Sequence, residues 1–451
     1  MRGVTAACIA VDAGCGYPGG ISGAEPPFDG KTGIIKKDKT MIIRPAERTG
    51  SVQEYYFSRK LKEIDRMNAG REASGQDRII NLGIGAPDGM PPAAAIEALR
   101  EAAAMPGNHA YQSYVGIPQL RQAFADWYSR YYHVRLDPGK EIQPLVGSKE
   151  GILLVSLAFL DKGDKVLVPD PGYPTYSSAS ALAEAEIVPY DLLEDRGWQP
   201  DFDALEKMDL SGVKIMWTNY PNMPTGAPAT EELYARLVDF GRRHGILICN
   251  DNPYSFILND KPLSILSVPG AMECCLELNS LSKAHNMSGW RIGMVAAEAG
   301  VISEILKVKS QMDSGMFRPL QLAAVEALSQ GPEWFEALNA GYRERKVLAG
   351  RIFDIIGAEY DRNSSGMFLW GKVSPDCRLL QGGTSGASIG EAVSDRILYG
   401  AGVFITPGFI FGKNGRDYIR ISLCAKPEVL EASAGKILGL MEKEGTLPDR
   451  G

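Results

Sequence analysis

Apolar and polar positions alternate along the middle of the chain in a pattern typical of strands separated by helices. Six short apolar or β-branched runs are expected to be strands, at residues 165–170, 186–192, 213–221, 245–251, 274–280 and 293–298. Helical spacing of apolar residues lies between several of them, for example at 230–244. This order predicts an α/β fold with a mostly parallel sheet that helices cover on both faces. Ligands bind such sheets at the carboxyl ends of the strands, so polar residues that directly follow a strand are candidate functional residues.

The two ends of the chain have a different pattern. Before the sheet, helical spacing predicts amphipathic helices at 51–67 and 118–132, with a short strand and a Gly/Pro loop at 79–92 between them. A helical stretch is expected at about 332–352. The following strands are expected at 351–360, 364–373 and 417–424, and the following helices at 388–400 and 427–443. We expect this last part to form a smaller α+β domain.

Composition limits the classes of function. The net charge of −7 leaves no overall basic surface for nucleic acid or an anionic membrane, and no apolar run is long enough to cross a bilayer. The seven cysteines and four histidines show no spacing typical of metal ligands, so no metal site is expected. An odd number of cysteines, several of them in apolar runs, fits the reducing cytoplasm. Residues 1–40 lack amphipathic periodicity, which predicts a disordered extension or, alternatively, a translation start at Met41.

The first candidate functional residues lie at the start of an apolar helix and after two of the predicted strands. Ser148 and Lys149 begin an apolar helix, where backbone N–H groups can bind a phosphate, although a glycine before a helix is a common arrangement. Tyr173 lies in a Pro/Gly turn and is either a packed aromatic residue or a ring that stacks on a planar cofactor. Asn219 and Asn222 lie in a turn after the next strand, where asparagine usually makes local hydrogen bonds.

Two later strand ends carry the charged groups. Asp251 and Tyr254 are three residues apart after a very apolar strand, where a carboxylate needs a partner. It could be a helix cap or the counter-charge of a protonated heterocyclic nitrogen. Ser280 and Lys283 end the following strand, and Arg291 comes eight residues after the lysine. Most lysines are solvated surface charges, but this one follows an apolar strand and hydroxyl groups.

In this order and spacing, the segments resemble the fold-type I, class I/II family of pyridoxal-phosphate aminotransferases. The resemblance covers about residues 50–445 and includes a late arginine, Arg420. Residues 111–121 and 170–178 are similar to the branch that contains alanine, diaminopimelate and methionine or aromatic aminotransferases. The resemblance implies an N-terminal arm and part of a small domain at 41–88, a large cofactor-binding domain with a seven-stranded sheet at 89–335, and the rest of the small domain at 336–451.

The resemblance also implies roles for the residues that would surround the reactive end of the cofactor. Lys283 would form an internal aldimine with pyridoxal 5′-phosphate and later move a proton between the substrate and the cofactor in a ping-pong transfer between an L-amino acid and a 2-oxo acid. Asp251 would keep the pyridine nitrogen protonated. Tyr254 would donate a hydrogen bond to O3′, Tyr173 would lie against the ring, and Asn222 is a further expected cofactor ligand.

The remaining expected ligands bind anions. The backbone amides of Ser148 and Lys149, the Ser280 hydroxyl and the Arg291 guanidinium would hold the phosphate, because an arginine fork can bind two oxygens. Tyr111, or Tyr114 if the alignment is shifted, would reach the phosphate of the neighbouring subunit, which implies a homodimer with shared active sites. Arg420 would bind the substrate carboxylate, and the backbone of Gly85 would approach the substrate.

Three further residues either depart from the family pattern or are expected to lie outside the cofactor site. The family usually has asparagine where this chain has Met223, and methionine cannot donate a hydrogen bond to O3′. Either Asn222 or Asn219 replaces it, or Tyr254 supports O3′ alone. Arg318 is expected at the dimer surface or, alternatively, near an acidic substrate side chain, and His285 is expected to be a packing residue.

Other activities can use the same cofactor site. A C–S lyase, an aminocyclopropane-carboxylate synthase and a decarboxylase share the lysine and the aspartate of this pattern. A ligand-sensing regulator is disfavoured by the short, weakly structured segment before residue 50. An inactive scaffold is disfavoured because all four key charged residues are present, namely Lys283, Asp251, Arg291 and Arg420. The sequence therefore predicts a cytoplasmic aminotransferase of amino-acid metabolism, with a role in biosynthesis.

Overall fold

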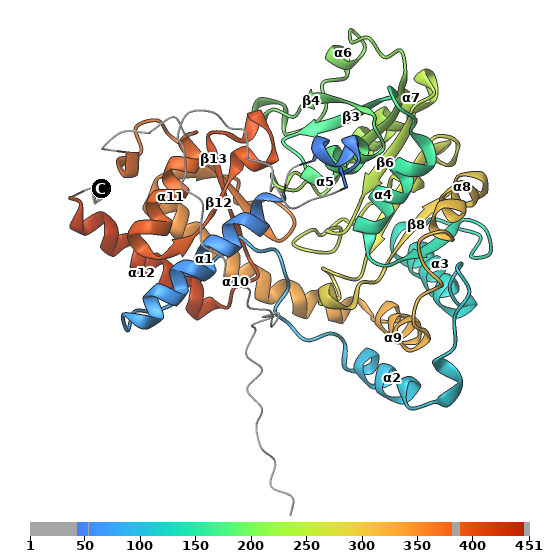
Figure 1. Ribbon diagram of the computed structural model, residues 1–451, viewed down its shortest axis with the longest axis horizontal. Coiled ribbons are helices and arrows are strands. Elements are labelled where there is room, and N and C mark those ends of the chain that lie inside the picture. Colours follow the sequence, from blue (N-terminus) through green and yellow to red (C-terminus); the bar gives the residue numbers. More distant parts are fainter. Residues whose placement is uncertain (1–42, 53, 381–387, 446–451) are drawn as a thin grey trace, which may run out of the picture. The chain divides into compact units, whose positions relative to one another are not determined.

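The main sheet has seven strands in the spatial order β2-β8-β7-β6-β5-β3-β4 (Figure 1). The computed structural model describes residues 43–52, 54–380 and 388–445. The strands are β2 Ile142–Leu145, β3 Lys165–Asp170, β4 Glu186–Asp191, β5 Val213–Thr218, β6 Leu247–Asp251, β7 Cys275–Ser280 and β8 Gly293–Ala297. All neighbours from β7 to β4 pair in parallel, and only β8 runs antiparallel to its two neighbours. The predicted α/β fold with a mostly parallel seven-stranded sheet is confirmed.

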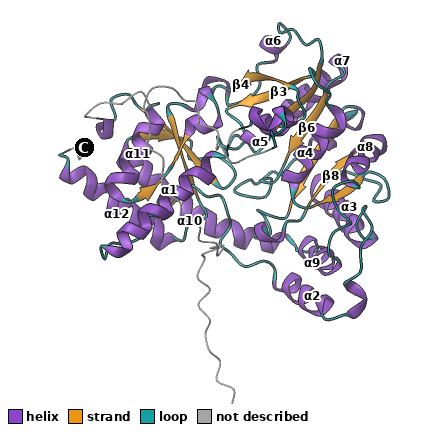
Figure 2. Ribbon diagram, viewed as in Figure 1, coloured by secondary structure: helices purple, strands orange, loops and turns teal. Residues whose placement is uncertain are grey.

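Helices cover both faces of this sheet, because successive strand residues point to opposite sides. In β3, Val166 and Val168 belong to one apolar core and Leu167 to the other. The first core contains side chains of α4 Ser148–Phe159, α5 Pro174–Leu182 and α8 Ala299–Lys309. The second contains side chains of α3 Pro118–Tyr132, α7 Glu231–His244 and α9 Arg318–Leu328. Figure 2 shows these helices around the orange strands. The strands are near-continuous apolar runs in the sequence because both of their faces are buried.

A second sheet has four antiparallel strands in the order β12-β13-β10-β9. Its strands are β9 Ala358–Tyr360, β10 Phe368–Val373, β12 Thr406–Pro407 and β13 Tyr418–Ser422. The helices of this part are α10 Pro332–Ile356, α11 Ile389–Ala401 and α12 Pro427–Lys443. One further parallel pair joins β1 Ile80–Asn81 to β11 Val403–Phe404. The strand expected at 351–360 is wrong, since its first six residues belong to α10.

That helix continues because its apolar residues have helical spacing. Ile352, Phe353 and Ile356 are all fully buried in the core of the second sheet, and they lie on one side of α10. Gly357 then ends the helix with a left-handed φ of 80°, a conformation that glycine adopts without steric cost. Only after this glycine does the chain become a strand.

The N-terminal part adds two helices and a short strand. Helix α1 spans Tyr56–Ala73 and packs through Ile64 on Leu398 and Phe404, and helix α2 spans Ala93–Ala103. The remaining short α-helix is α6 Phe202–Leu205. Residues 46–451 cluster as one compact unit. The disorder expected for residues 1–40 lies outside the described residues. Within the described ranges, no helix is long and apolar enough to cross a membrane.

Candidate active site

A cavity of about 360 Å³ lies where strands of the main sheet end. Most of the residues that the sequence singled out line it, namely Gly85, Ser148, Lys149, Tyr173, Asp251, Tyr254, Ser280, Lys283, Arg291 and Arg420. These residues come from segments as far apart as β1 and β13, so the fold brings together what the sequence separates by more than 300 positions. Two predicted site residues, Asn222 and Tyr111, are not among the lining residues.

Lys283 lies in the turn that follows β7 and directs its amine into the cavity. The Nζ atom donates a hydrogen bond to the carbonyl oxygen of Gly85 at 2.5 Å. A side chain at Gly85 would overlap Phe368, since an added Cβ would lie 2.3 Å from the ring, so only glycine permits this approach. Burial, with further contributions from Arg420 and Arg291, lowers the pKa of Lys283. A buried amine with a lowered pKa is suited to nucleophilic attack on a carbonyl carbon.

Asp251 ends β6 and presents one carboxylate oxygen without a partner. Its Oδ2 accepts a hydrogen bond from the Tyr176 hydroxyl at 3.0 Å, whereas Oδ1 is buried and has no donor among the described residues. Burial raises the pKa of Asp251 to about 7, and the Tyr176 hydrogen bond opposes this rise. A buried, unpaired acceptor is costly, so it indicates a donor that a ligand brings to the site.

Hydroxyl groups and backbone amides form a cup for an anion at one end of the cavity. Ser148 begins helix α4, and the hydroxyls of Ser280 and Ser282 lie 2.8 Å apart beside it in the cavity wall. The guanidinium of Arg291 packs so closely on Gly147 that an added Cβ would lie 2.2 Å from Nη2, and Gly147 has a φ of 77°. Free N–H groups at a helix N-terminus, hydroxyls and a guanidinium together fit a phosphate.

Arg420 is a buried cation with no carboxylate partner among the described residues. Nη2 donates to the carbonyl oxygen of Gly83 at 2.7 Å, and Nε has no partner. Three phenylalanine rings surround the guanidinium, Phe368 at 3.9 Å, Phe411 at 4.7 Å and Phe57 at 5.7 Å. Burial lowers the pKa of Arg420 to about 10, so it stays charged at neutral pH. A desolvated arginine with a free donor is a strong site for a carboxylate.

The turn after β5 places Met223, and not Asn222, at the cavity. Asn222 uses its side chain inside the turn, donating to Asn219 O at 3.2 Å and accepting from Thr225 Oγ1 at 2.8 Å. Asn219 lines the cavity, but its amide donates to Asp251 O and accepts from Met223 N. Met223 lies with its sulfur 3.2 Å from Nη1 of Arg420. These bonds use one of the two N–H donors of each amide, so each asparagine keeps one N–H, and of the two only Asn219 lines the cavity.

Three other residues lie away from the cavity. Tyr111 is 91% exposed and is not one of the residues that line the cavity. Arg318 begins α9, and its buried Nε has no partner among the described residues. His285 is fully buried between the rings of Trp127 and Phe335, and burial lowers its pKa to about 3. A neutral histidine among aromatic rings is a packing residue, as expected.

Several residues of the site have no signal in the local sequence. Tyr176 could have been noticed only as one of several aromatic residues after β3, because its bond to Asp251 joins positions 75 residues apart. The three rings around Arg420 come from separate segments, and only Phe411 lies close to it in the sequence. The side chain of Lys149 was also missed, although its Nζ lies 5.1 Å from the Tyr55 ring and 5.9 Å from the Tyr173 ring.

The fold, the amine of Lys283, the phosphate cup and the buried arginine define a class of enzyme. The chain belongs to the family "Aminotransferase class I and II", which matches residues 77–437. It is a pyridoxal-phosphate-dependent aminotransferase. Its residues fit the cofactor, since the unpaired Oδ1 of Asp251 suits a protonated ring nitrogen and the cup suits the phosphate.

Individual relatives are similar over almost their whole length. The LL-diaminopimelate aminotransferase of Desulforudis audaxviator is 40% identical over 395 residues, which covers 87% of this chain and 97% of that enzyme. The LL-diaminopimelate aminotransferase of Aquifex aeolicus is also 40% identical, over 88% of this chain and 98% of that enzyme. Among solved structures, substrate-bound BacF from Bacillus subtilis superposes with a TM-score of 0.81 at 33% identity, over 91% of this chain and all of that one. These relatives favour the aminotransferase over the lyase, synthase, decarboxylase, sensor and scaffold alternatives.

Proposed function

We propose that this aminotransferase acts on an amino acid that carries a second carboxylate at its far end, of the diaminopimelate type. The observation that carries this proposal is that three cationic side chains besides Lys283 line one cavity, namely Arg291, Arg420 and Lys149. Within the described ranges none of them forms an ion pair with a carboxylate. One anion site would serve the cofactor phosphate, one the α-carboxylate and one the distal carboxylate. The names of the two curated relatives agree with this substrate class.

Each cation is placed for a different anion. Arg291 borders the cup at the start of α4, and Arg420 lies on the second sheet beside Gly83 and Met223. The Lys149 ammonium lies 5.1 Å from the Tyr55 ring and 5.9 Å from the Tyr173 ring. Cation–π contacts of this kind hold an ammonium in place without neutralising its charge. The apolar residues Phe57 and Ile84 line the cavity and suit the methylene chain of a long substrate.

The proposal also assigns roles to the residues around the cofactor. When bound, pyridoxal phosphate supplies a carbonyl group that takes up the amino group and a ring that accepts electrons from the substrate Cα. Lys283 provides the amine that holds the cofactor and accepts or returns a proton at Cα. Asp251 keeps the ring nitrogen protonated, and Tyr254 and Tyr173 bind its oxygen O3′ and its face. Closure of a small domain formed by residues 41–88 and 336–451 over the large domain at 89–335 would exclude water.

We further propose that the enzyme is a homodimer in which Tyr111 completes the neighbouring phosphate cup. Tyr111 is 91% exposed, and other large apolar side chains near it in the fold are exposed as well, including Tyr114, Met312 and Phe317. Such exposed apolar groups are typical of an interface with a second subunit. The five described cysteines are all free thiols, which fits the cytoplasm as the location. Sedimentation analysis tests the dimer, and a monomer at micromolar concentration would contradict it.

The substrate proposal is tested with purified, cofactor-loaded enzyme and a panel of amino donors. LL-diaminopimelate should be used far better than alanine, methionine or phenylalanine. Lys149→Met should raise the KM for diaminopimelate by roughly tenfold through loss of one charged contact, and leave the KM for methionine unchanged. Lys162→Met, a change at an exposed lysine, is the control. A preference for donors without a second carboxylate, or an equal effect of Lys149→Met on all donors, would contradict the proposal.

A further inference from the structure

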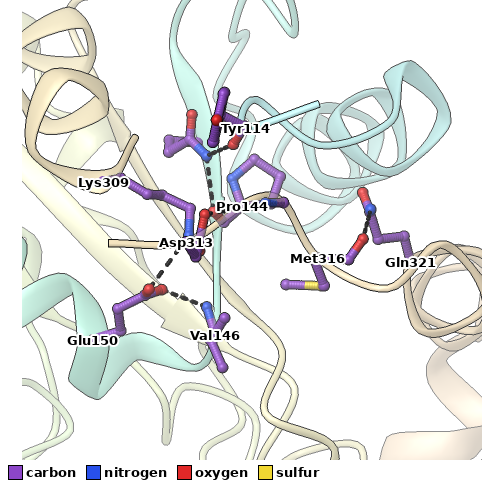
Figure 3. A network of polar contacts seen from close by, with 10 residues as sticks. Tyr114, Pro144, Val146, Glu150, Lys309, Asp313, Met316 and Gln321 are labelled. Atoms are coloured by element: carbon purple, nitrogen blue, oxygen red, sulfur yellow. Dashed lines mark hydrogen bonds and ion pairs between the residues drawn. The ribbon is translucent and has the colours of Figure 1, made fainter. Parts of the chain in front are cut away.

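A lysine with a nearly fully buried side chain lies behind the phosphate cup. Lys309 ends helix α8, and its side chain is 3% exposed. Its ammonium pairs with Glu150 at 3.3 Å and with Asp313 through a shorter contact (Figure 3). Buried ammonium groups are expensive and are usually paired, so two carboxylates on one lysine indicate a fixed position.

Glu150 connects this lysine to the cup. It lies in the first turn of α4, two residues after Ser148, and its Oε2 accepts the N–H of Val146 at 2.6 Å. Figure 3 shows the carboxylate between Val146 on one side and Lys309 on the other. The bond to Val146 fixes the loop that leads into the cup, as a side chain near a helix start can do for the residues before it. The Val146 amide is thus fixed on Glu150, two residues before Ser148 of the cup.

Lys309 compensates the negative charge of Glu150. A carboxylate in the same helical turn as the cup repels a phosphate dianion, and this repulsion is strong where water is excluded. Lys309 offsets that charge on Oε1 while Oε2 keeps its bond to the loop. The ammonium thus reduces the negative charge that Glu150 presents to the cup while Glu150 holds the loop, and it is shared between Glu150 and Asp313.

The second carboxylate explains why Lys309 cannot turn away. Asp313 Oδ1 also accepts the N–H of Gly315 at 3.2 Å, which shapes the loop after α8. Gly315 packs against the backbone of Gln112, where an added Cβ would lie 2.4 Å from the carbonyl oxygen. Two residues after Gln112, the carbonyl oxygen of Tyr114 accepts a hydrogen bond from Gln143 Nε2 at 2.8 Å. The ammonium is therefore anchored in packed structure.

We infer that Lys309 is a positioning residue that sets the affinity of the cup for the cofactor's phosphate by neutralising Glu150. The inference rests on the proposed placement of the phosphate at Ser148 and Lys149. It concerns a residue that touches neither cofactor nor substrate. Lys309 is expected to affect the binding of the cofactor's phosphate group and to leave the binding of its ring unchanged.

The test measures dissociation constants of the cofactor-free protein for pyridoxal phosphate and for pyridoxal, which lacks the phosphate, by the change in visible absorbance. In the wild type, the phosphate ester should bind much more tightly. Lys309→Met should weaken pyridoxal phosphate binding roughly tenfold or more, as expected for an uncompensated buried charge, and leave pyridoxal binding within about twofold. Lys307→Met, at the exposed partner of Glu304, should change neither constant. An unchanged ratio of the two constants in Lys309→Met overturns the inference.

A double variant separates electrostatics from packing. In Lys309→Met with Glu150→Gln, the amide oxygen can still accept the Val146 N–H, and the charge of Glu150 is gone while that of Asp313 stays. Because Glu150 is the carboxylate in the same helical turn as the cup, the affinity for pyridoxal phosphate should recover. A folded double variant without recovery overturns the role of Glu150. If Lys309→Met does not fold, Glu150→Gln alone decides, because it should bind pyridoxal phosphate at least as tightly as the wild type, and weaker binding overturns the inference. A wild-type protein that binds neither compound would instead contradict the cofactor site itself.

Discussion

The hydroxyl of Tyr176 donates a hydrogen bond to Oδ2 of Asp251 at 3.0 Å, and the other carboxylate oxygen of Asp251 stays free at the cavity. The tyrosine ring is fixed by stacking on Trp217, with the two rings 5.1 Å apart and 5° from parallel. One oxygen is thus held and the other is available to the cofactor. The hydrogen bond also stabilises the charged form of the carboxylate, which counteracts the cost of its burial.

Tyr176→Phe should therefore lower activity without unfolding the protein. The hydrogen bond to a charged group is worth about 1.5–3 kcal/mol, so we expect kcat/KM to fall roughly 10- to 100-fold while the ring keeps its stacking. Tyr190→Phe is the matched control, since Tyr190 is equally buried and donates to Trp217 O at 2.7 Å. Kinetics and thermal melts of both variants check the prediction. Equal loss of activity in the two variants would show that only packing matters.

The raised pKa of Asp251 predicts a pH dependence of stability in the cofactor-free protein. Its pKa is about 7 in the folded protein against an ordinary value of 3.8. Between these values the folded state holds a proton that the unfolded chain has lost, so the free energy of unfolding falls as pH rises, and the loss is complete above pH 7. Asp251→Asn removes this penalty. It should be more stable than the wild type by up to about 4 kcal/mol at pH 8, and by much less at pH 5.

Urea denaturation of the cofactor-free variants between pH 5 and pH 8 measures this difference. Asp126→Asn, a change at an exposed carboxylate, provides the baseline. A difference between Asp251→Asn and the wild type that does not vary with pH would contradict a raised pKa. The same variant should lose several orders of magnitude in turnover, because a neutral amide cannot keep the ring nitrogen of the cofactor protonated.

The sequence predicts those parts of the fold and site that depend on local pattern. Helix α12 has the expected bounds at 427–443, and β3 the expected bounds at 165–170, because continuous apolar spacing specifies each of them. Lys283 could be identified because it follows a strand end with hydroxyls before it. The segment at 351–360 was misread because Ile352, Phe353 and Ile356 also form a short apolar run, and the helix stops only at Gly357.

Features that depend on distant contacts could not be predicted. The guanidinium of Arg420 contacts rings from three separate segments, Phe57, Phe368 and Phe411, and none of these has a local motif. Likewise, the buried position of Lys309 depends on Glu150, which is 159 residues away. Charged side chains of this kind look like surface residues in a sequence until the fold shows which groups surround them.

Arg420→Lys should weaken substrate binding far more than it disturbs the fold. Lysine keeps the charge but loses the planar fork, and its shorter reach leaves a carboxylate with one donor in place of two. We expect the KM of the amino donor to rise about 10- to 100-fold, with a smaller change in cofactor binding. Arg416→Lys, at an exposed arginine before the same strand, should have wild-type kinetics. An unchanged KM in Arg420→Lys would place the α-carboxylate elsewhere.

Met223→Asn should lower the pKa at which the visible absorbance band of the bound cofactor changes. Met223 lines the cavity at the position where the family resemblance implies an asparagine, and a thioether cannot donate a hydrogen bond to an anionic oxygen of the cofactor. An asparagine donor would stabilise that anion, so the proton on the neighbouring nitrogen would be released at lower pH. Met223→Leu is the control, because it also removes the sulfur that lies 3.2 Å from Arg420 Nη1 but introduces no donor. The titration should therefore shift in the asparagine variant alone, and the same midpoint in both variants would mean that Tyr254 already satisfies this oxygen.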